Sequence, residues 1–263
     1  AVGDEFTCAL LNDSTIKCWG RNTSGQLGYG HTDRLGDDPG EMGDNLPVVD
    51  LGTGKTATAI TAGGMVSCAL LSDGTVKCWG SNRYGQLGDG TTTNRSTPVS
   101  VTGISTATQI NVGQYHTCAR LSGGTVKCWG SNWQNQLGFD PRSTQKTPSS
   151  TVTGISNAIM VLAGNTHTCA ILSNGTMKCW GNPELSGRLG DGTIDAYAPV
   201  TVTGVTNAVE ISLGLDHACV RISDGTVKCW GNAPKGDGTW DNIGATPAQI
   251  QGISGAVQII SAG

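Results

Sequence analysis

The chain has 263 residues, of which 40 are glycine and only 14% are charged. This composition disfavours long surface helices and suits short strands joined by tight turns, so we expect an all-β fold. A net charge of −4 argues against a nucleic-acid partner, and no apolar run approaches the roughly 20 residues needed for membrane insertion.

The chain repeats itself. The stretch SCALLSDGTVKCWG at residues 67–80 occurs five times with small changes, and its first cysteine recurs at spacings of 60, 50, 51 and 50 residues. Repeats of this length indicate an array of similar structural units. We therefore expect one domain, residues 1–263, built from five units at approximately 1–52, 53–103, 104–154, 155–204 and 205–263.

Each unit is predicted to contain four strands. An apolar segment ending in glycine, such as ATQINVG at 107–113, precedes a strand of the TCAxL type. A turn of the SDGT type leads into the VKCWG strand, and a loop of the SNxxGQLGDGT type leads to a last strand such as TPVSVTG. Several short strands separated by turn residues are typical of sandwiches, barrels and propellers.

The register of the central hairpin follows from its turn. Ser72, Asp73 and Gly74 resemble a three-residue loop in which a type I turn is closed by a glycine at positive φ. Leu71 then faces Thr75, and counting outward places Cys68 opposite Cys78. The same count pairs the other cysteines: Cys8 with Cys18, Cys118 with Cys128, Cys169 with Cys179, and Cys219 with Cys229.

Five identical cross-strand pairs favour disulfides and an oxidising compartment. No CxxC pair occurs, which argues against a zinc site. Reduced thiols acting as metal ligands or nucleophiles are the alternative, which the repetition of one position inside the strands disfavours.

A tryptophan follows the second cysteine of every unit. We expect these indoles to pack between neighbouring sheets rather than to form a ligand platform, because one structural position is occupied in every copy. The five residues are Trp19, Trp79, Trp129, Trp180 and Trp230.

The stretch GQYHTCARLSGGTVKCWGSNWQNQLG resembles the repeat of the regulator of chromosome condensation family, and the likeness covers essentially the whole chain. The resemblance implies a β-propeller of five four-stranded blades. The CxLxxDGTVxCWG core looks more like the secreted bacterial branch of that family. The exchange-factor and nucleosome roles of the seven-bladed founding member are not expected here, because this chain has five units, an acidic balance and ten cysteines.

The two ends of the chain predict ring closure. The last residues, VQIISAG at 257–263, match the strand that precedes the hairpin in other units, so that residues 261–263 overlay residues 1–3. We expect the C-terminal strand to join the first blade and close the ring. The alternative is a segment of a longer ring or array.

Positions that differ between the copies are free to contact a partner. The loop after the second cysteine carries large aromatic and polar side chains of the kind that form binding hot spots. The binding candidates are Arg83, Tyr84, Trp133, Gln134 and Trp240. Exposed aromatics of this kind can also simply cap the edge of a blade.

The residues just before the first cysteine form a second variable zone, which includes Asp4, Met65, Gln114 and Tyr115. Three units carry histidine there: His116, His167 and His217. These rings could converge and hold a metal. A structural hydrogen bond to a neighbouring loop is the favoured interpretation.

An insertion at residues 30–47 of the first unit is rich in acidic residues. Hard oxygen ligands of this type could bind Ca²⁺, although their order does not match the twelve-residue calcium loop. The candidates are Asp33, Asp37, Asp38, Glu41 and Asp44. A solvated acidic loop is the favoured interpretation, and no other cofactor is expected.

No motif for catalysis is present: the glycines fall at repeated turns, and no nucleophile elbow occurs. We do not expect an enzyme. The sequence favours an extracellular or cell-surface binding and adhesion module that presents its variable loops to a protein or glycan. The alternatives are a structural subunit of an extracellular assembly or fibre, whose copies pack together, and a proteinaceous enzyme inhibitor.

Overall fold

A computed structural model describes residues 1–139, 143–182, 187–192, 198–234 and 242–260. The chain divides into two compact units. Unit 1 comprises Ala1–Ser122, Lys127–Ser131 and Thr144–Ser150, and unit 2 comprises Gly123–Val126, Asn132–Ser143 and Thr151–Gly263. The expectation of a single domain stays a prediction. Among the described residues, no helix has the length and apolar character needed to cross a membrane.

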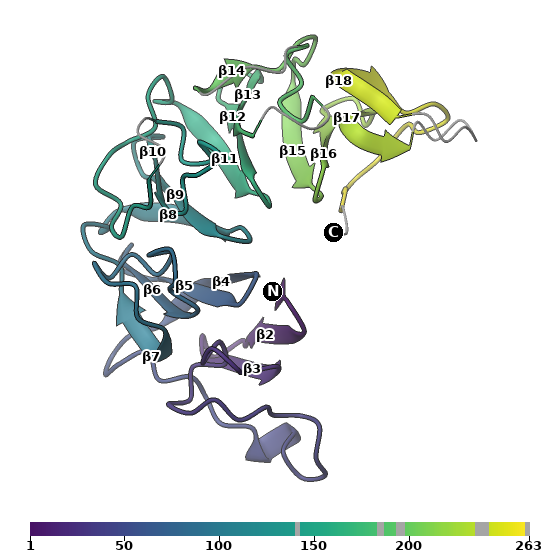
Figure 1. The fold of residues 1–263 in the computed structure, drawn as a ribbon. Helices are drawn as coiled ribbons and strands as arrows, with labels where there is room; N and C mark the ends of the chain where they lie inside the picture. Colours follow the sequence, from purple (N-terminus) through teal and green to yellow (C-terminus); the bar gives the residue numbers. More distant parts are fainter. Residues whose placement is uncertain (140–142, 183–186, 193–197, 235–241, 261–263) are drawn as a thin grey trace. The chain divides into compact units, whose positions relative to one another are not determined.

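The chain folds into five antiparallel sheets, which we call blades one to five (Figure 1). In every blade each strand pairs with the next one along the chain. Blade one contains β1 (Val2–Gly3), β2 (Phe6–Leu10) and β3 (Ile16–Gly20); blade two β4 (Ala57–Gly63), β5 (Val66–Leu71), β6 (Val76–Gly80) and β7 (Arg95–Ser100); blade three β8 (Ala107–Val112), β9 (His116–Leu121) and β10 (Val126–Gly130); blade four β11 (Ala158–Ala163), β12 (His167–Leu172), β13 (Met177–Gly181) and β14 (Val200–Thr201); blade five β15 (Ala208–Leu213), β16 (His217–Ile222), β17 (Val227–Pro234) and β18 (Asn242–Gln249).

The all-β prediction is confirmed, and the strand number varies between blades. Blades two, four and five have four strands, whereas blades one and three have three strands in the described residues. Isolated bridges, Gly20 to Leu35 and Gly130 to Gln145, stand where a fourth strand would begin. In blade one the acidic insertion occupies this stretch and contains the short 3₁₀ helix η1 (Gly43–Asn45).

The predicted hairpin register is confirmed. In blade two Leu70 pairs with Val76, and Cys68 pairs with Cys78. The turn is closed by hydrogen bonds from the Leu71 amide to the Thr75 carbonyl (2.9 Å) and from the Gly74 amide to the Leu71 carbonyl (3.0 Å). Gly74 has φ of +77°, a conformation that glycine adopts without steric cost.

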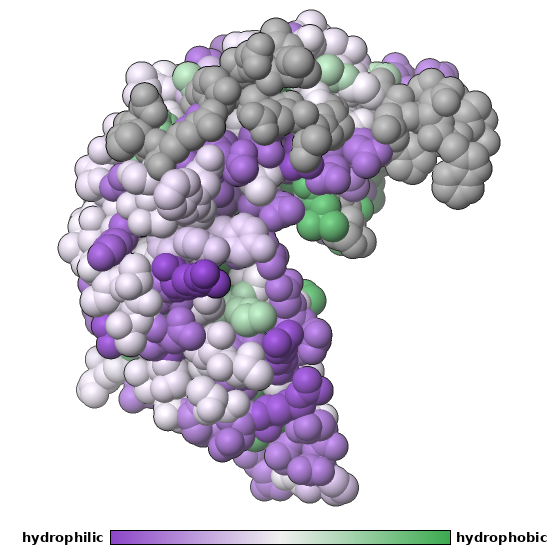
Figure 2. Space-filling view, in the orientation of Figure 1, coloured by the Kyte–Doolittle hydropathy of each residue, from purple (hydrophilic) through white to green (hydrophobic). Residues whose placement is uncertain are grey.

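Within each unit, consecutive blades share apolar cores. In unit 1, Trp79 of blade two packs in one cluster with Cys8, Cys18 and Leu27 of blade one. In unit 2, Trp230 of blade five packs with residues of blade four, including Met177 and Leu189. On the face shown in Figure 2, strongly hydrophobic residues form only a few small patches. The blades therefore bury apolar side chains mainly against neighbouring blades of the same unit. Removal of this apolar surface from water stabilises the fold.

The predicted packing role of the tryptophans is confirmed for four of the five. The side chains of Trp79, Trp129, Trp180 and Trp230 are fully buried, and Trp19 of blade one is half buried. Three of the four buried indoles also donate a hydrogen bond to a backbone carbonyl of the preceding repeat. The acceptors are Gln86 for Trp129 (2.9 Å), Gln136 for Trp180 (3.0 Å) and Arg188 for Trp230 (2.7 Å).

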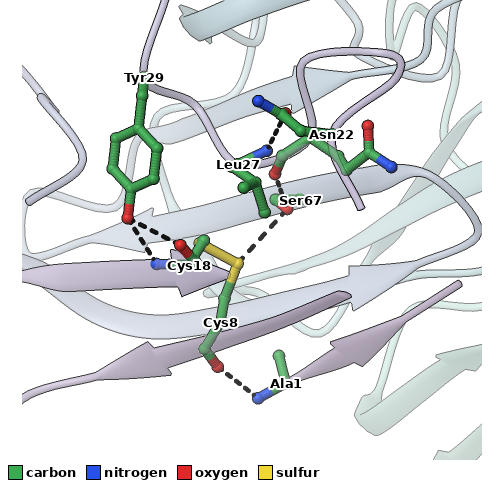
Figure 3. Close-up of a disulfide and its surroundings, with 8 residues drawn as sticks. Ala1, Cys8, Cys18, Asn22, Leu27, Tyr29 and Ser67 are labelled. Atoms are coloured by element: carbon green, nitrogen blue, oxygen red, sulfur yellow. Dashed lines mark hydrogen bonds between the residues drawn. A yellow bond between two sulfur atoms is a disulfide. The ribbon is translucent and has the colours of Figure 1, made fainter. Parts of the chain in front are cut away.

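All ten cysteines form the predicted disulfides, each with a Cα–Cα distance of 4.1 Å. Figure 3 shows the bridge between Cys8 and Cys18, whose sulfur lies 3.7 Å from the Ser67 hydroxyl of blade two. The Tyr29 hydroxyl accepts a hydrogen bond from the Cys18 amide (2.8 Å) and donates one to the Cys18 carbonyl (3.0 Å). Each hairpin is thus tied covalently near its middle.

The predicted ring closure requires the C-terminal segment to pair with the first blade, and the structure describes only part of that segment. Val2 and Gly3 form β1 and pair with Thr7 and Phe6 of β2. Residues 257–260 form no strand, and residues 261–263 lie outside the described residues. Closure of a ring by the C-terminal strand therefore stays a prediction.

Candidate functional site

The hairpin register brings two variable zones to the same end of each blade: the residues before the first cysteine and the loop after the second. In blade two, β5 and β6 pair as far as Val66 and Gly80, and beyond them the Ser81 amide donates to the Met65 carbonyl (2.9 Å). The same bond joins Ser131 to Tyr115 in blade three (3.0 Å). Residues just before the first cysteine strand therefore lie beside the loop that follows the second.

At this edge of unit 1 a pocket of about 290 Å³ opens between residues of blades one, two and three. We call it the tyrosine pocket. Its lining residues are Asp4, Met65, Ser81, Arg83, Tyr84, Gln86, Gln114 and Tyr115.

Two aromatic rings form one wall of the tyrosine pocket. Tyr84 and Tyr115 contact edge to face, with ring centroids 5.7 Å apart and an interplanar angle of 84°. The Arg83 guanidinium carbon lies 5.7 Å from the centroid of the Tyr84 ring, within the range of a cation–π contact. Tyr115 keeps 39% of its surface exposed, so its ring is available to a ligand. Such edge-to-face pairs are favourable by about 0.5–1.5 kcal/mol beyond burial.

Hydrogen bonds hold the pocket residues in place. The buried Gln86 accepts the Tyr84 amide through Oε1 (2.8 Å), which fixes the loop. The Asp4 amide donates to the Gly64 carbonyl (2.7 Å), which ties blade one to blade two. Gln114 donates its side-chain amide to the Asp4 carboxylate (2.9 Å), which adds blade three. The site is therefore largely formed before any ligand arrives.

The pocket carries one group of each charge. Arg83 supplies only donors, and the Asp4 carboxylate supplies only acceptors. Within the part of the chain that the structure describes, neither takes part in an ion pair. A ligand in the pocket would meet both groups.

The sequence-based candidates are distributed unevenly. Arg83 and Tyr84 line the tyrosine pocket. Trp133 and Gln134 belong to unit 2, where Trp133 is 59% exposed and the Gln134 amide donates to Gln136 Oε1 (2.9 Å). Trp240 lies outside the described residues.

Four members of the pocket were recognised from sequence only as variable positions: Asp4, Met65, Gln114 and Tyr115. The register count of the hairpin could have predicted that these residues lie close to Arg83. Continued three residues beyond Cys68 and Cys78, it sets Met65 opposite Ser81, where the structure places the hydrogen bond between them.

The repeated histidines are structural in character. His116 and His167 are fully buried, and His217 is half buried. Burial lowers the pKa of His116 to about 3, so the ring is neutral at physiological pH. Within the described ranges, no group of three or more His, Cys, Asp or Glu residues could hold a metal ion.

In the acidic insertion, the Glu41 side chain binds backbone amides of the same loop. Its carboxylate accepts the backbone amides of Gly36 (2.7 Å), Asp38 (3.2 Å) and Asp37 (3.3 Å), and these bonds lower its pKa. Asp33 lies 3.4 Å from His31, and Asp37 lies 3.9 Å from Arg34. Asp38 and Asp44 are exposed. A calcium ion held by these residues stays a prediction.

Repeated antiparallel blades, each built on the same disulfide-bridged hairpin, define a repeat β-propeller. The chain belongs to the regulator of chromosome condensation (RCC1) repeat family. One repeat model of this family matches residues 73–120 and 123–171. A second matches residues 1–26, 57–86, 107–136, 162–185 and 208–236.

This chain spans 21% of the length of the curated relative named below and 65% of the length of each of the two solved structures. The ultraviolet-B receptor UVR8 of Arabidopsis thaliana is 34% identical over 104 residues, which are 39% of this chain and 21% of the receptor. Yeast RCC1 (Prp20), solved bound to Kap60, matches with a TM-score of 0.80 at 22% identity, over 100% of this chain and 65% of that one. Human WBSCR16 matches with a TM-score of 0.76 at 19% identity, over 94% and 65%. The two solved structures establish the propeller fold.

Proposed function

We propose that this protein is an extracellular binding module that engages a protein or glycan partner through the tyrosine pocket of unit 1. The observation that carries the proposal is the contact of Tyr84 with Tyr115 beside Arg83, on loops that differ between repeats. Tyrosine and arginine are among the residue types that most often dominate binding energy. Rigid aromatic side chains on a preformed edge bind at a low cost in conformational entropy.

The extracellular setting is supported by the cysteines. All ten are paired, and each bridge joins a hairpin. Disulfides in this number persist in oxidising compartments and are rare in reducing ones. A protein partner is also in keeping with the yeast relative that was solved bound to Kap60.

The test compares the parent with Tyr84→Ala and Tyr115→Ala on glycan arrays, immobilised cell-surface extracts and intact cells. Both variants should bind at least tenfold more weakly. Ile159→Ala is the control, because this exposed apolar residue belongs to unit 2 and not to the pocket. If both tyrosine variants bind as well as the parent does, the pocket is not the binding site.

Assembly of copies is the second candidate, and one feature of unit 2 favours it. Ile253, Val257 and Ile260 are 44%, 87% and 82% exposed beside an apolar groove of about 350 Å³ that also exposes Ile250. Exposed apolar clusters of this kind mark interaction surfaces. Sedimentation velocity of the parent and of a Val257→Ser, Ile260→Ser variant tests it: assembly predicts larger species for the parent only, and a monomeric parent excludes it.

A further inference from the structure

We infer that the tyrosine pocket binds a neutral sugar ring, as one residue of a glycan. This inference rests on the proposed function and specifies its ligand. It follows from three properties of the pocket: the polarity of its lining, the opposite charges of Arg83 and Asp4, and the exposed ring of Tyr115.

The lining is rich in groups that hydrogen-bond to hydroxyls. Every lining residue except Met65 carries a polar side-chain group. A sugar hydroxyl both donates and accepts, so one hydroxyl can donate to the Asp4 carboxylate while a neighbouring one accepts from Arg83. Ligands rich in adjacent hydroxyls therefore suit a pocket that combines a donor-only and an acceptor-only group.

The two charges also argue against a charged ligand. A carboxylate placed against Arg83 would lie in the same small pocket as the Asp4 carboxylate, and a cation placed against Asp4 would lie in the same pocket as Arg83. In a partly desolvated site, like charges repel and unpaired charges are costly to bury. A neutral ligand pairs with both groups without either cost.

The aromatic wall supplies the apolar part of the recognition. A pyranose ring presents a face of C–H groups, and the exposed ring of Tyr115 offers a flat surface for that face. The Tyr84 ring packs against the Tyr115 ring edge to face and holds its orientation. At about 290 Å³ the pocket lies just below the usual range for ligand sites, about 300–1,000 Å³, so it fits one sugar residue and not a long segment.

The experiment uses purified protein and saturation-transfer NMR with methyl glycosides of glucose, galactose, mannose and N-acetylglucosamine. Glucuronic acid and an N-acetylated acidic peptide serve as charged comparisons. At least one neutral glycoside should bind, and its affinity should fall at least tenfold in Tyr115→Ala and in Asp4→Asn. Tyr115→Phe should retain most of the affinity, and Ile159→Ala, at an exposed position of unit 2, all of it. Circular dichroism of each variant reports that it is folded.

The outcomes separate this inference from the proposed function. Binding of no neutral glycoside, preference for the charged probes, or unchanged affinity in Tyr115→Ala overturns the inference. If a protein or cell-surface partner still binds in a manner that depends on Tyr84 and Tyr115, the proposed function stands without the sugar. If the partner and the glycosides are both indifferent to these variants, both proposals fail.

Discussion

The indole of Trp129 donates a 2.9 Å hydrogen bond to the backbone carbonyl of Gln86. The bond joins the second strand of the blade-three hairpin to the loop of blade two, and the Thr117 hydroxyl donates to the same carbonyl (2.9 Å). Trp79 occupies the equivalent position in blade two, yet its Nε1 has no hydrogen-bond partner among the described residues. There the equivalent carbonyl, that of Gln26, accepts the Ser67 hydroxyl (2.8 Å).

This difference makes the two tryptophans a matched pair. Both indoles are fully buried, so a Trp→Phe change removes the same volume from each site. Trp129→Phe should lower the free energy of unfolding by about 2–3 kcal/mol, and Trp79→Phe by about 1 kcal/mol less, because only the first change breaks a hydrogen bond. Urea denaturation followed by circular dichroism measures both. Equal losses would show that the bond to Gln86 adds nothing to packing.

Ser14 is predicted to be a weak point in the blade-one hairpin. It has φ of +66° at the turn position where blade two has Gly74 and blade four has Gly175. A side chain in this region costs roughly 1–2 kcal/mol, of which the greater chain entropy of unfolded glycine cancels part. Ser14→Gly should therefore stabilise the protein by about 0.5–1 kcal/mol.

Thermal denaturation of Ser14→Gly should show an increased melting temperature. Gly74→Ser is the reciprocal control, because a Cβ at Gly74 would lie 2.8 Å from the Ser105 carbonyl oxygen. This variant should be destabilised. A neutral or destabilised Ser14→Gly variant would contradict the argument.

The disulfides should differ in their resistance to reduction. Cys68 and Cys78 are completely buried, whereas Cys219 is half buried and lines the groove in unit 2. Because exchange requires access of a thiolate to the sulfur, the bridge from Cys219 to Cys229 should be reduced before the bridge from Cys68 to Cys78. Mild reduction of the folded protein, alkylation and peptide mapping give the order.

Loss of one bridge should also cost stability. Replacing both Cys68 and Cys78 by alanine should lower the free energy of unfolding by about 2–3 kcal/mol, since a short closed loop no longer restricts the unfolded chain. Alkylation of the unreduced protein in denaturant, which exposes every sulfur, should label no cysteine. Labelling at several positions would refute the pairing and, with it, the argument for an extracellular setting.

Stability should fall on mild acidification because of His116. Burial holds its pKa at about 3 in the folded state, against 6.5 when unfolded, so the unfolded state binds more protons between these values. The contribution is complete above about pH 6.5 and declines as the pH falls toward 3, by up to about 1.4 kcal/mol per pH unit.

Urea midpoints at about pH 7 and about pH 5.5 measure this decline in a range where exposed carboxylates stay ionised. His116→Gln should reduce the difference between the two pH values even if it lowers stability overall. Burial also lowers the pKa of His217, which acts in the same direction, so a residual slope is expected. An unchanged slope in His116→Gln would refute the assignment.

Local patterns allowed much of the fold to be predicted. The turn at Asp73 and Gly74 set the strand register, and the structure has Cys68 opposite Cys78 as counted. The strand number was less predictable, because a fourth strand depends on a segment that the insertion at 30–47 replaces in blade one. Of the candidate site, Arg83 and Tyr84 were identified from sequence as loop residues that could bind a partner. Their contacts with the residues of the other blades were not predicted.

The sequence by itself determined the hairpin and its bridge, since cysteines ten residues apart and one glycine turn specify a local geometry that needs no distant contact. Only the tertiary structure decided the pocket. Gln114 donates to Asp4 across 110 residues of chain, and Tyr115 meets Tyr84 from a different blade. Such contacts depend on the distance between adjacent blades. That distance is set by the packing of the side chains buried between them, and no local sequence pattern specifies it.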